Sequence, residues 1–190
     1  LNSRNGHKPV RLKPEPKPSP MNWRPQTAED LIGQARSVCA AQVAKARRVR
    51  DARNAACKLL LYGPPGVGKT TVAELVAREL TGTPLGIESF NGKEVTVDAV
   101  RGWMETLPYG SLFSHWSVKI INELDRCSKD AQDILLTYLD KLPSGKALIG
   151  TSNLQLDLLT ERFQTRFQSI KLTAPGTEEI AEFLRLHWKV

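Results

Sequence analysis

A glycine-rich segment at residues 63–70, Gly-Pro-Pro-Gly-Val-Gly-Lys-Thr, constrains the fold more than any other part of this sequence. It fits the pattern G-x-x-x-x-G-K-[ST], the phosphate-binding P-loop, which joins a strand to the start of a helix. A short apolar run at 58–62 precedes it, and an amphipathic stretch at 70–80, closed by Gly82, follows it. The segment therefore predicts a strand, a phosphate-binding loop and a helix in direct succession.

The residue types of the P-loop explain how it would hold phosphate. Glycines let the backbone wrap a phosphate with its N–H groups, and the start of the helix adds positive potential. Lys69 can reach the β- and γ-phosphates, and the Thr70 hydroxyl can ligate Mg²⁺. A glycine-rich turn that matches by accident is the alternative, and both flanking elements argue against it. The predicted phosphate-binding residues are Gly63, Pro64, Pro65, Gly66, Val67, Gly68, Lys69, Thr70 and Thr71.

The rest of the chain continues the alternation of short apolar runs and amphipathic stretches. Four more strands are predicted at 85–90, 117–121, 147–150 and 169–172. Helices are predicted at 96–106 and 128–142, together with an alanine-rich helix that Ser37 caps and that ends near residue 56. Apolar strands that alternate with amphipathic helices are typical of an α/β fold with a parallel sheet. We therefore expect a five-stranded parallel sheet with helices on both faces.

A polar pair ends the predicted strand at 117–121. A P-loop site needs an acidic residue on a neighbouring strand to hold the metal and activate water, and Glu123 is suited to polarise an attacking water. Asn122 stands where an aspartate is usual, and an amide brings no negative charge. We expect Thr70 and Asn122 to hold Mg²⁺, less tightly than an aspartate would. In the alternative reading, Glu123 and Asp125 simply begin a solvated helix.

The formal net charge of +7 is unevenly distributed. Residues 1–57 contain 12 of the 27 basic residues and only 4 of the 20 acidic ones. Residues 1–21 are rich in proline and basic residues, which predicts a disordered tail. A basic helix around residues 45–53 can bind nucleic acid through phosphates or can be a solvated helix face. The charge is therefore weak support for DNA binding.

Cysteine spacing and hydropathy exclude several other classes of protein. The three cysteines form no C-x-x-C pair, so neither a disulfide framework nor a zinc ribbon is indicated. No apolar run approaches the length of about 18 residues that a membrane span needs. We expect a cytoplasmic protein without a membrane partner.

Further motifs make residues 22–190 resemble the AAA+ ATPases, within them the branch of clamp loaders and Holliday-junction helicases. Residues 23–34 are similar to the family's R-P-x-T…D-x-x-G-Q box, which lies against the adenine. By that resemblance Arg24, Pro25, Ile32 and Gly33 contact the base.

Three more positions match motifs of that family near the reacting phosphate. Residues 150–153, Gly-Thr-Ser-Asn, look like sensor 1, so Asn153 would orient water or touch the γ-phosphate. Residues 165–167, Thr-Arg-Phe, are similar to the segment that carries the arginine finger, so Arg166 would act in a neighbouring subunit's site, with Arg162 as a competitor. Asn91 matches the polar residue that can hold the catalytic glutamate away from water.

The resemblance implies a P-loop NTPase with an AAA+ core at 22–172 and the start of a truncated helical lid at 173–190. It implies ATP or ADP with Mg²⁺, other AAA+ subunits as partners, and action on DNA or a DNA-bound protein. The catalytic residues of the ATPase would be Lys69, Glu123, Asn153 and Arg166. Asn122 keeps a second hypothesis open, a structural subunit that binds nucleotide without hydrolysing it. A small-molecule P-loop kinase is disfavoured because no acceptor-binding lid is recognisable.

Overall fold

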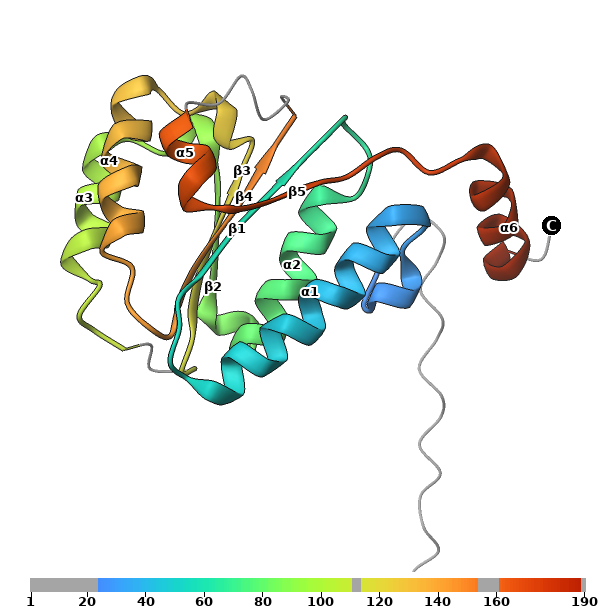
Figure 1. Ribbon diagram of the computed structural model, residues 1–190, viewed down its shortest axis with the longest axis horizontal. Helices are drawn as coiled ribbons and strands as arrows, with labels where there is room; N and C mark the ends of the chain where they lie inside the picture. The colour runs from blue at the N-terminus through green and yellow to red at the C-terminus, as the bar shows by residue number, and fades with distance from the viewer. Residues whose placement is uncertain (1–23, 111–113, 154–160, 189–190) are drawn as a thin grey trace, which may run out of the picture.

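A five-stranded parallel sheet forms the centre of the computed structural model, which describes residues 24–110, 114–153 and 161–188 (Figure 1). The strand order is β2-β3-β4-β1-β5, and every neighbouring pair is parallel. The strands are β1 Cys57–Tyr62, β2 Ile87–Asn91, β3 Ser117–Asn122, β4 Lys146–Ser152 and β5 Gln168–Lys171. The predicted fold class is confirmed, and each predicted strand lies within two residues of an observed one at both ends.

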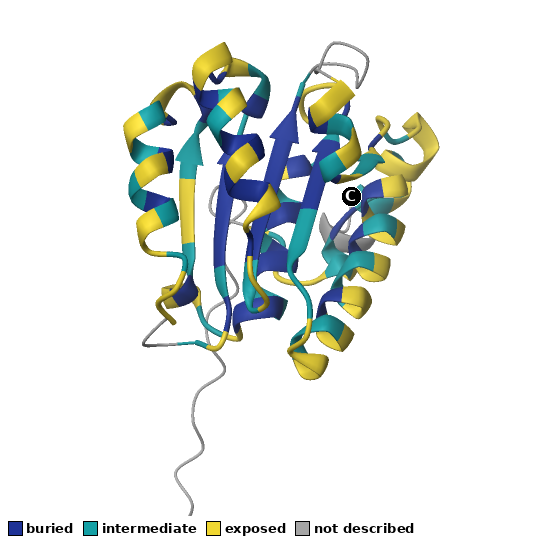
Figure 2. Cartoon of the chain, turned by 60° about the vertical axis from the view of Figure 1, so that its left-hand side comes forward, coloured by how far each residue is buried: buried dark blue, intermediate teal, exposed yellow. Residues whose placement is uncertain are grey.

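Helices cover both faces of this sheet (Figures 1 and 2). The helices α1 Gly33–Ala52 and α2 Lys69–Thr81 pack on one face, and α3 Val97–Glu105 and α4 Lys129–Asp140 pack on the other. Two more helices follow β4: the short α5 Glu161–Arg166 packs against α4, and α6 Thr177–Trp188 projects beyond the sheet next to the start of α1. Single 3₁₀ turns occur at Ala28–Asp30, Pro84–Gly86, Gly92–Glu94 and Leu124–Arg126.

Alternate residues of the central strands enter two separate hydrophobic cores. Leu59 and Leu61 face α1 and α2, whereas Leu60 faces α3 and α4, because successive side chains of a strand point to opposite faces. All three are at most 1% exposed. The central strands are accordingly the most buried part of the chain (Figure 2). A strand buried on both faces has a continuous apolar run, which is the pattern that predicted these strands.

Helix α1 differs from its prediction at both ends. It begins at Gly33, with Ile32 as the capping residue, and the Ser37 hydroxyl instead donates to the carbonyl of Gln34. The additional first turn is held from outside the helix, since Gln34 Oε1 accepts from the backbone N–H and the hydroxyl of Thr173 at 2.8 and 2.7 Å. The helix ends at Ala52 because Arg53 adopts a left-handed conformation, φ 52°. A contact 139 residues away in sequence therefore overrides the local capping signal.

Two observations concern the predicted domain boundaries, and a third concerns membrane spans. Helix α6 begins at Thr177, inside the segment predicted to start a lid. The predicted tail at 1–21 lies outside the described residues. Within the ranges that the structure describes, no helix is long and apolar enough to cross a membrane.

Candidate functional site

The P-loop follows the carboxyl end of β1 and leads directly into α2. Three of its glycines have positive φ values: 145° at Gly63, 80° at Gly66 and 88° at Gly68. A Cβ atom on Gly63 would lie 2.1 Å from the carbonyl oxygen of Leu172, so only glycine fits at this close approach. Gly66 has open space where its side chain would be, which leaves the backbone there accessible. The loop therefore has the glycine backbone conformations, with open space at Gly66, that a phosphate-binding loop needs.

Lys69 bridges this loop from the first residue of α2. Its side chain is buried, and its Nζ donates to the carbonyl oxygens of Gly63 at 2.9 Å and Pro64 at 2.6 Å. Burial lowers the pKa of Lys69, and the charges of Asp125 and Glu123 partly oppose that shift. A polyphosphate in the loop would favour the charged ammonium much more strongly than two carbonyl groups do.

A neutral polar cluster lies beside Lys69, where β2, β3 and β4 approach the start of α2. The Thr70 hydroxyl donates to Asn122 Oδ1 at 3.1 Å, and Asn122 Nδ2 donates to the Ser89 hydroxyl at 3.2 Å. The Thr151 hydroxyl lies 3.5 Å from the same Oδ1. A hydroxyl and an amide oxygen side by side fit an Mg²⁺ ion that keeps most of its water and phosphate ligands. The predicted metal pair, Thr70 and Asn122, is thus brought together, and it is uncharged.

Glu123 and Asn153, which directly follow β3 and β4, are in contact at the carboxyl edge of the sheet. Asn153 Nδ2 donates to Glu123 Oε1 at 3.3 Å, and the Arg126 guanidinium lies 3.1 Å from Glu123 Oε2. The backbone N–H of Asn153 donates to Asp125 Oδ1 at 3.2 Å. Both oxygens of the Glu123 carboxylate therefore have a partner, and the predicted acid and the predicted sensor are in direct contact.

The backbone at Glu123 is unusual. Glu123 has φ 56° and ψ 52°, a left-handed conformation that few residues other than glycine adopt, and its N–H donates to the Thr151 hydroxyl at 3.1 Å. A Cβ atom on Gly92 would lie 2.1 Å from the Glu123 carbonyl oxygen. Asn91, just before Gly92, accepts from the N–H of Lys93 through its side chain, so it caps the turn after β2. Asn153 rather than Asn91 is therefore the amide that contacts the glutamate.

Several residues that shape this site were not predicted from the sequence. Ser89, Gly92 and Arg126 each contact Asn122 or Glu123 and belong to no motif, whereas Thr151 contacts both residues from within the segment that is similar to sensor 1. The strand register contains a usable signal, since Asn91 pairs with Asn122 and Gly150 with Ile121, so the residues that follow them converge on one edge.

A small cavity of about 230 Å³ separates the start of α1 from α6. Ile32 and Gly33 line it, together with Glu179 and Phe183 of α6. The other two residues predicted to contact the base, Arg24 and Pro25, are not among its lining residues. The carbonyl of Arg24 instead accepts from Gln26 Nε2. Half of the predicted base-contacting set therefore meets at this cavity.

Arg166 lies apart from these groups. It stands two residues before Gln168, the first residue of β5, which pairs with Leu59 in the middle of β1, whereas the P-loop follows the carboxyl end of β1. Its Nε and Nη2 donate to the two carboxylate oxygens of Asp140 at 2.9 and 3.0 Å, and its Nη1 donates to the carbonyl of Arg162 at 3.1 Å. This hydrogen bonding is the main cause that lowers the pKa of Asp140. The remaining predicted catalytic residue thus lies outside the chain's own P-loop site.

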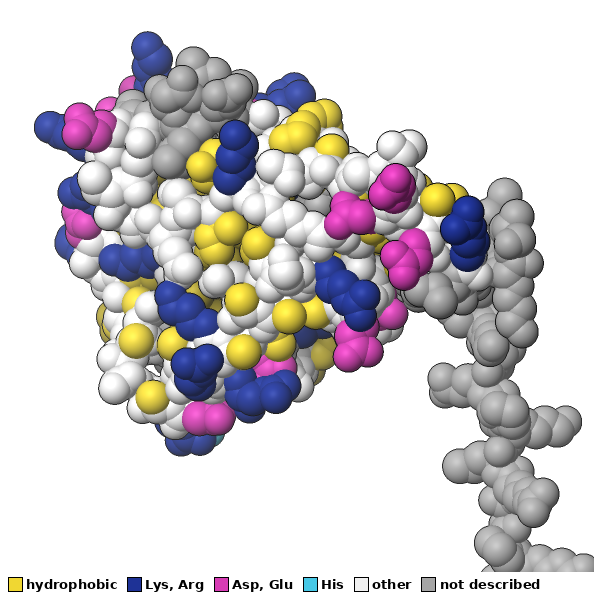
Figure 3. Space-filling view, turned by 45° about the vertical axis from the view of Figure 1, so that its right-hand side comes forward, with side chains coloured by type: hydrophobic (Ala, Val, Ile, Leu, Met, Phe, Trp, Pro, Cys, Tyr) yellow, Lys and Arg dark blue, Asp and Glu magenta, His cyan; other side chains and the backbone are white. Residues whose placement is uncertain are grey.

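Charge on the surface around α1 is mixed. Figure 3 shows Lys and Arg side chains spread between apolar atoms on the face that carries α1, with acidic side chains toward α6. Arg47 and Arg50 both bind Glu79 of α2, so part of the basic helix is neutralised within the chain. The arrangement resembles a solvated helix face more than a continuous phosphate-binding track.

Residues 59–173 match the model of the ATPase family associated with various cellular activities (AAA). Among curated proteins, the replication factor C small subunit 2 of Pyrobaculum islandicum is 30% identical over 67% of this chain and 41% of its own length. The replication-associated recombination protein A of Bacillus subtilis is 32% identical over 65% of this chain and 27% of its own length. The chain thus spans less than half the length of these relatives.

A solved structure of Thermotoga maritima RuvB, in a single-residue variant, has the same fold. It superimposes with a TM-score of 0.66 at 23% sequence identity, covering 85% of this chain and 52% of that one. The matched family model covers more than half of the chain and includes the P-loop, Glu123, Asn153 and Arg166. The chain therefore belongs to the AAA family of ATPases, as its motifs indicated, with relatives among replication factor C subunits and replication-associated recombination proteins.

Proposed function

We propose that this chain is an ATP-binding and ATP-hydrolysing module that works at interfaces between subunits to remodel DNA or a DNA-bound protein. The observation that carries this proposal is the grouping of Lys69, the Thr70–Asn122 pair and the Glu123–Asn153 pair at the carboxyl ends of β1, β3 and β4. The DNA-related part is supported by the names of the replication and recombination relatives. Each of these relatives is much longer than the region matched here.

The residues of the site have distinct roles in this proposal. Bound ATP supplies the phosphoryl group, and Mg²⁺ neutralises part of its charge. Lys69 exchanges its two carbonyl partners for phosphate oxygens, and Thr70 and Asn122 hold the hydrated metal. Glu123 orients a water and accepts its proton at the carboxylate, which Asn153 keeps in place through Oε1. Arg166 stabilises charge in the site of a neighbouring subunit, since it is remote from its own.

Asn122 favours a second candidate, a subunit that binds nucleotide as a structural switch without hydrolysing it. The cluster of Thr70, Asn122, Ser89 and Thr151 is neutral throughout. A carboxylate at position 122 would add one negative charge next to the metal. Without it, Mg²⁺ binding and the alignment of water are weaker, and turnover is slow.

ATP binding and turnover in three variants test the proposal. Lys69→Ala should abolish ATP binding, whereas Lys93→Ala, an exposed lysine after β2, should leave it intact. ATP binding that survives Lys69→Ala would overturn the proposed site. Asn122→Asp separates the two candidates: turnover that appears only in this variant supports the switch, and substantial turnover in the unmodified chain excludes it.

A further inference from the structure

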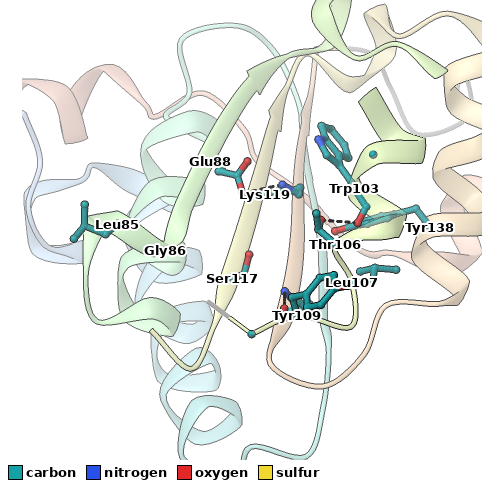
Figure 4. Close-up of a pocket in the computed structure, with 13 residues that line it drawn as sticks. Leu85, Gly86, Glu88, Trp103, Thr106, Leu107, Tyr109, Ser117, Lys119 and Tyr138 are labelled. Carbon is teal, nitrogen blue, oxygen red and sulfur yellow. Dashed lines mark hydrogen bonds and ion pairs between the residues drawn. The ribbon is translucent and has the colours of Figure 1, made fainter. Parts of the chain in front are cut away.

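A second cavity lies at the opposite end of the sheet from the P-loop, on the face that α3 and α4 cover. It has a volume of about 440 Å³, within the range of small-molecule pockets. Ser117 and Lys146, the first residues of β3 and β4, line it, as do Glu88 and Lys119. Trp103 and Tyr138 close it from the helical side (Figure 4). We call this space the amino-end cavity.

A lysine occupies a core position in its wall. Lys119 is the third residue of β3, on the face where Ile121 enters the hydrophobic core, and it is only 6% exposed. Its Nζ lies 2.8 Å from Glu88 Oε1 and 5.0 Å from the ring centroid of Trp103. Burying an ammonium group is costly, and an apolar side chain would fill this position at lower cost. The hydrophobic core alone therefore gives no reason for a lysine here.

Further hydrogen-bond donors face the same space. Tyr138 is 2% exposed, and Figure 4 shows its side chain reaching from α4 toward Thr106 and the strands. In the described part of the chain, its hydroxyl has no hydrogen-bond partner. The Lys146 ammonium donates only to the carbonyl of Tyr109 among the described residues. Burial and the nearby charge of Lys119 lower the pKa of Lys146. Two ammonium groups and this hydroxyl thus share the cavity with the carboxylate of Glu88.

We propose that the amino-end cavity binds a small organic anion, in which a carboxylate or phosphate ester is attached to a flat apolar group. The acidic group would accept hydrogen bonds from Lys146, Lys119 and the Tyr138 hydroxyl. The apolar group would lie against Trp103, Leu107 and Tyr109, which form the apolar part of the wall. The site is separate from the P-loop, so its occupant need not be a nucleotide.

Chemical labelling locates such a site directly. Pyridoxal 5′-phosphate is an aromatic phosphate whose aldehyde forms an imine with an unprotonated lysine, with loss of water, and borohydride then makes the bond permanent. On the whole chain, we expect Lys146 to be labelled at least tenfold faster than the exposed Lys93 and Lys129, as measured by peptide mass spectrometry. Equal labelling of the three lysines would overturn the proposal.

Competition by unreactive anions identifies the acidic group. Phenyl phosphate and benzoate each present a flat ring with one acidic group, and protection of Lys146 by either supports the proposal and shows which acid is preferred. Protection by neither overturns it. ATP should protect Lys69 from labelling but should not protect Lys146. The experiment therefore tests nucleotide binding at the P-loop and anion binding in the amino-end cavity separately. Equal protection of both lysines by ATP would contradict a distinct site.

The variant Tyr138→Phe tests the role of the hydroxyl without creating a cavity in the hydrophobic core. Tyr138→Phe keeps the ring and removes only the hydroxyl, so the fold should survive, as thermal unfolding would verify. We expect the concentration of the protecting anion needed to shield Lys146 to rise about tenfold, the usual effect of losing one hydrogen bond to a charged group. Tyr62→Phe, which removes a hydroxyl at the other end of the sheet, is the matched control. If the anion protects Lys146 equally well in Tyr138→Phe, the hydroxyl does not contact the anion, and the proposed set of donors is overturned.

Discussion

The two ends of the sheet gather polar side chains in different ways. At the carboxyl end, polar groups follow the strands and depend on unusual backbone: three glycines with positive φ, and Glu123 in a left-handed conformation. At the amino end, Lys119 stands inside an ordinary strand at a core position, and Lys146 is the first residue of the neighbouring strand. The arrangement at the carboxyl end therefore depends on backbone shape, and the arrangement at the amino end depends on side-chain chemistry within regular strands. Three substitutions test this difference, and a fourth tests an ion pair that lies outside both ends.

The largest effect should come from the carboxylate at the carboxyl end. Glu123→Gln keeps the shape of the side chain and removes its charge and basicity, so ATP turnover should fall at least about 100-fold while ATP binding persists. Turnover and nucleotide binding are measured in parallel. Glu105→Gln at the end of α3 serves as the control, and a turnover reduced less than about tenfold would argue against Glu123 as the base.

Backbone shape at the same end should be nearly as sensitive. Gly92→Ala places a Cβ atom against the Glu123 carbonyl, so we expect the free energy of unfolding to fall by about 3 kcal/mol. Gly102→Ala is the matched control, because its Cβ would meet open space within α3. Helix propensity predicts that the control gains about 0.5–1 kcal/mol. Similar denaturant midpoints for the two variants would contradict the backbone argument.

Side-chain chemistry at the amino end predicts a smaller effect on stability. Lys119→Met leaves Glu88 without its partner, but the Glu88 side chain is 57% exposed and remains hydrated. The free energy of unfolding should therefore change by no more than about 1 kcal/mol, while anion protection of Lys146 is lost. Leu148→Ala, at the position paired with Lys119, should cost about 2–5 kcal/mol. A comparable loss in Lys119→Met would show that the lysine is structural.

The smallest effect concerns the ion pair that belongs to neither end cluster. Arg166 lowers the pKa of Asp140, so this carboxylate stabilises the folded chain above its unfolded pKa, and the contribution disappears as pH falls through the lower folded value. Asp140→Asn should therefore be slightly less stable than the unmodified chain at neutral pH, and this difference should disappear at an acidic pH below the lowered pKa of Asp140. Thermal unfolding at both pH values measures this, and a difference that grows in acid would contradict the assignment.

The carboxyl-end site was largely predictable because its five principal polar residues are each tied to a local motif. Lys69, Thr70, Asn122, Glu123 and Asn153 follow strands whose apolar runs are evident, and parallel strands bring their carboxyl ends to one edge. The strand positions were predictable for the same reason. The start of α1 was not, because Thr173 supplies the contact that extends the helix beyond Ser37.

The amino-end cavity left almost no trace in the sequence. Lys119 is a single polar residue within an apolar run, and the run still predicts a buried strand despite it. Tyr138 has the helical spacing of a core residue, and it is one by burial. Only the three-dimensional arrangement shows that no described residue pairs with its hydroxyl and that two lysines lie nearby. Spacing rules detect backbone shape and burial but not the pairing of charges across strands.

The two hydrogen bonds between Thr173 and Gln34 also have a mechanical consequence. They fix the chain just beyond β5 to the first turn of α1, and only the three residues at 174–176 separate this anchor from α6. With 12 residues, α6 is about 18 Å long, and it begins beside the cavity that Ile32 and Gly33 line. Because Glu179 and Phe183 of α6 line that cavity together with Ile32 and Gly33 of the α1 side, the position of α6 sets the width of the cavity.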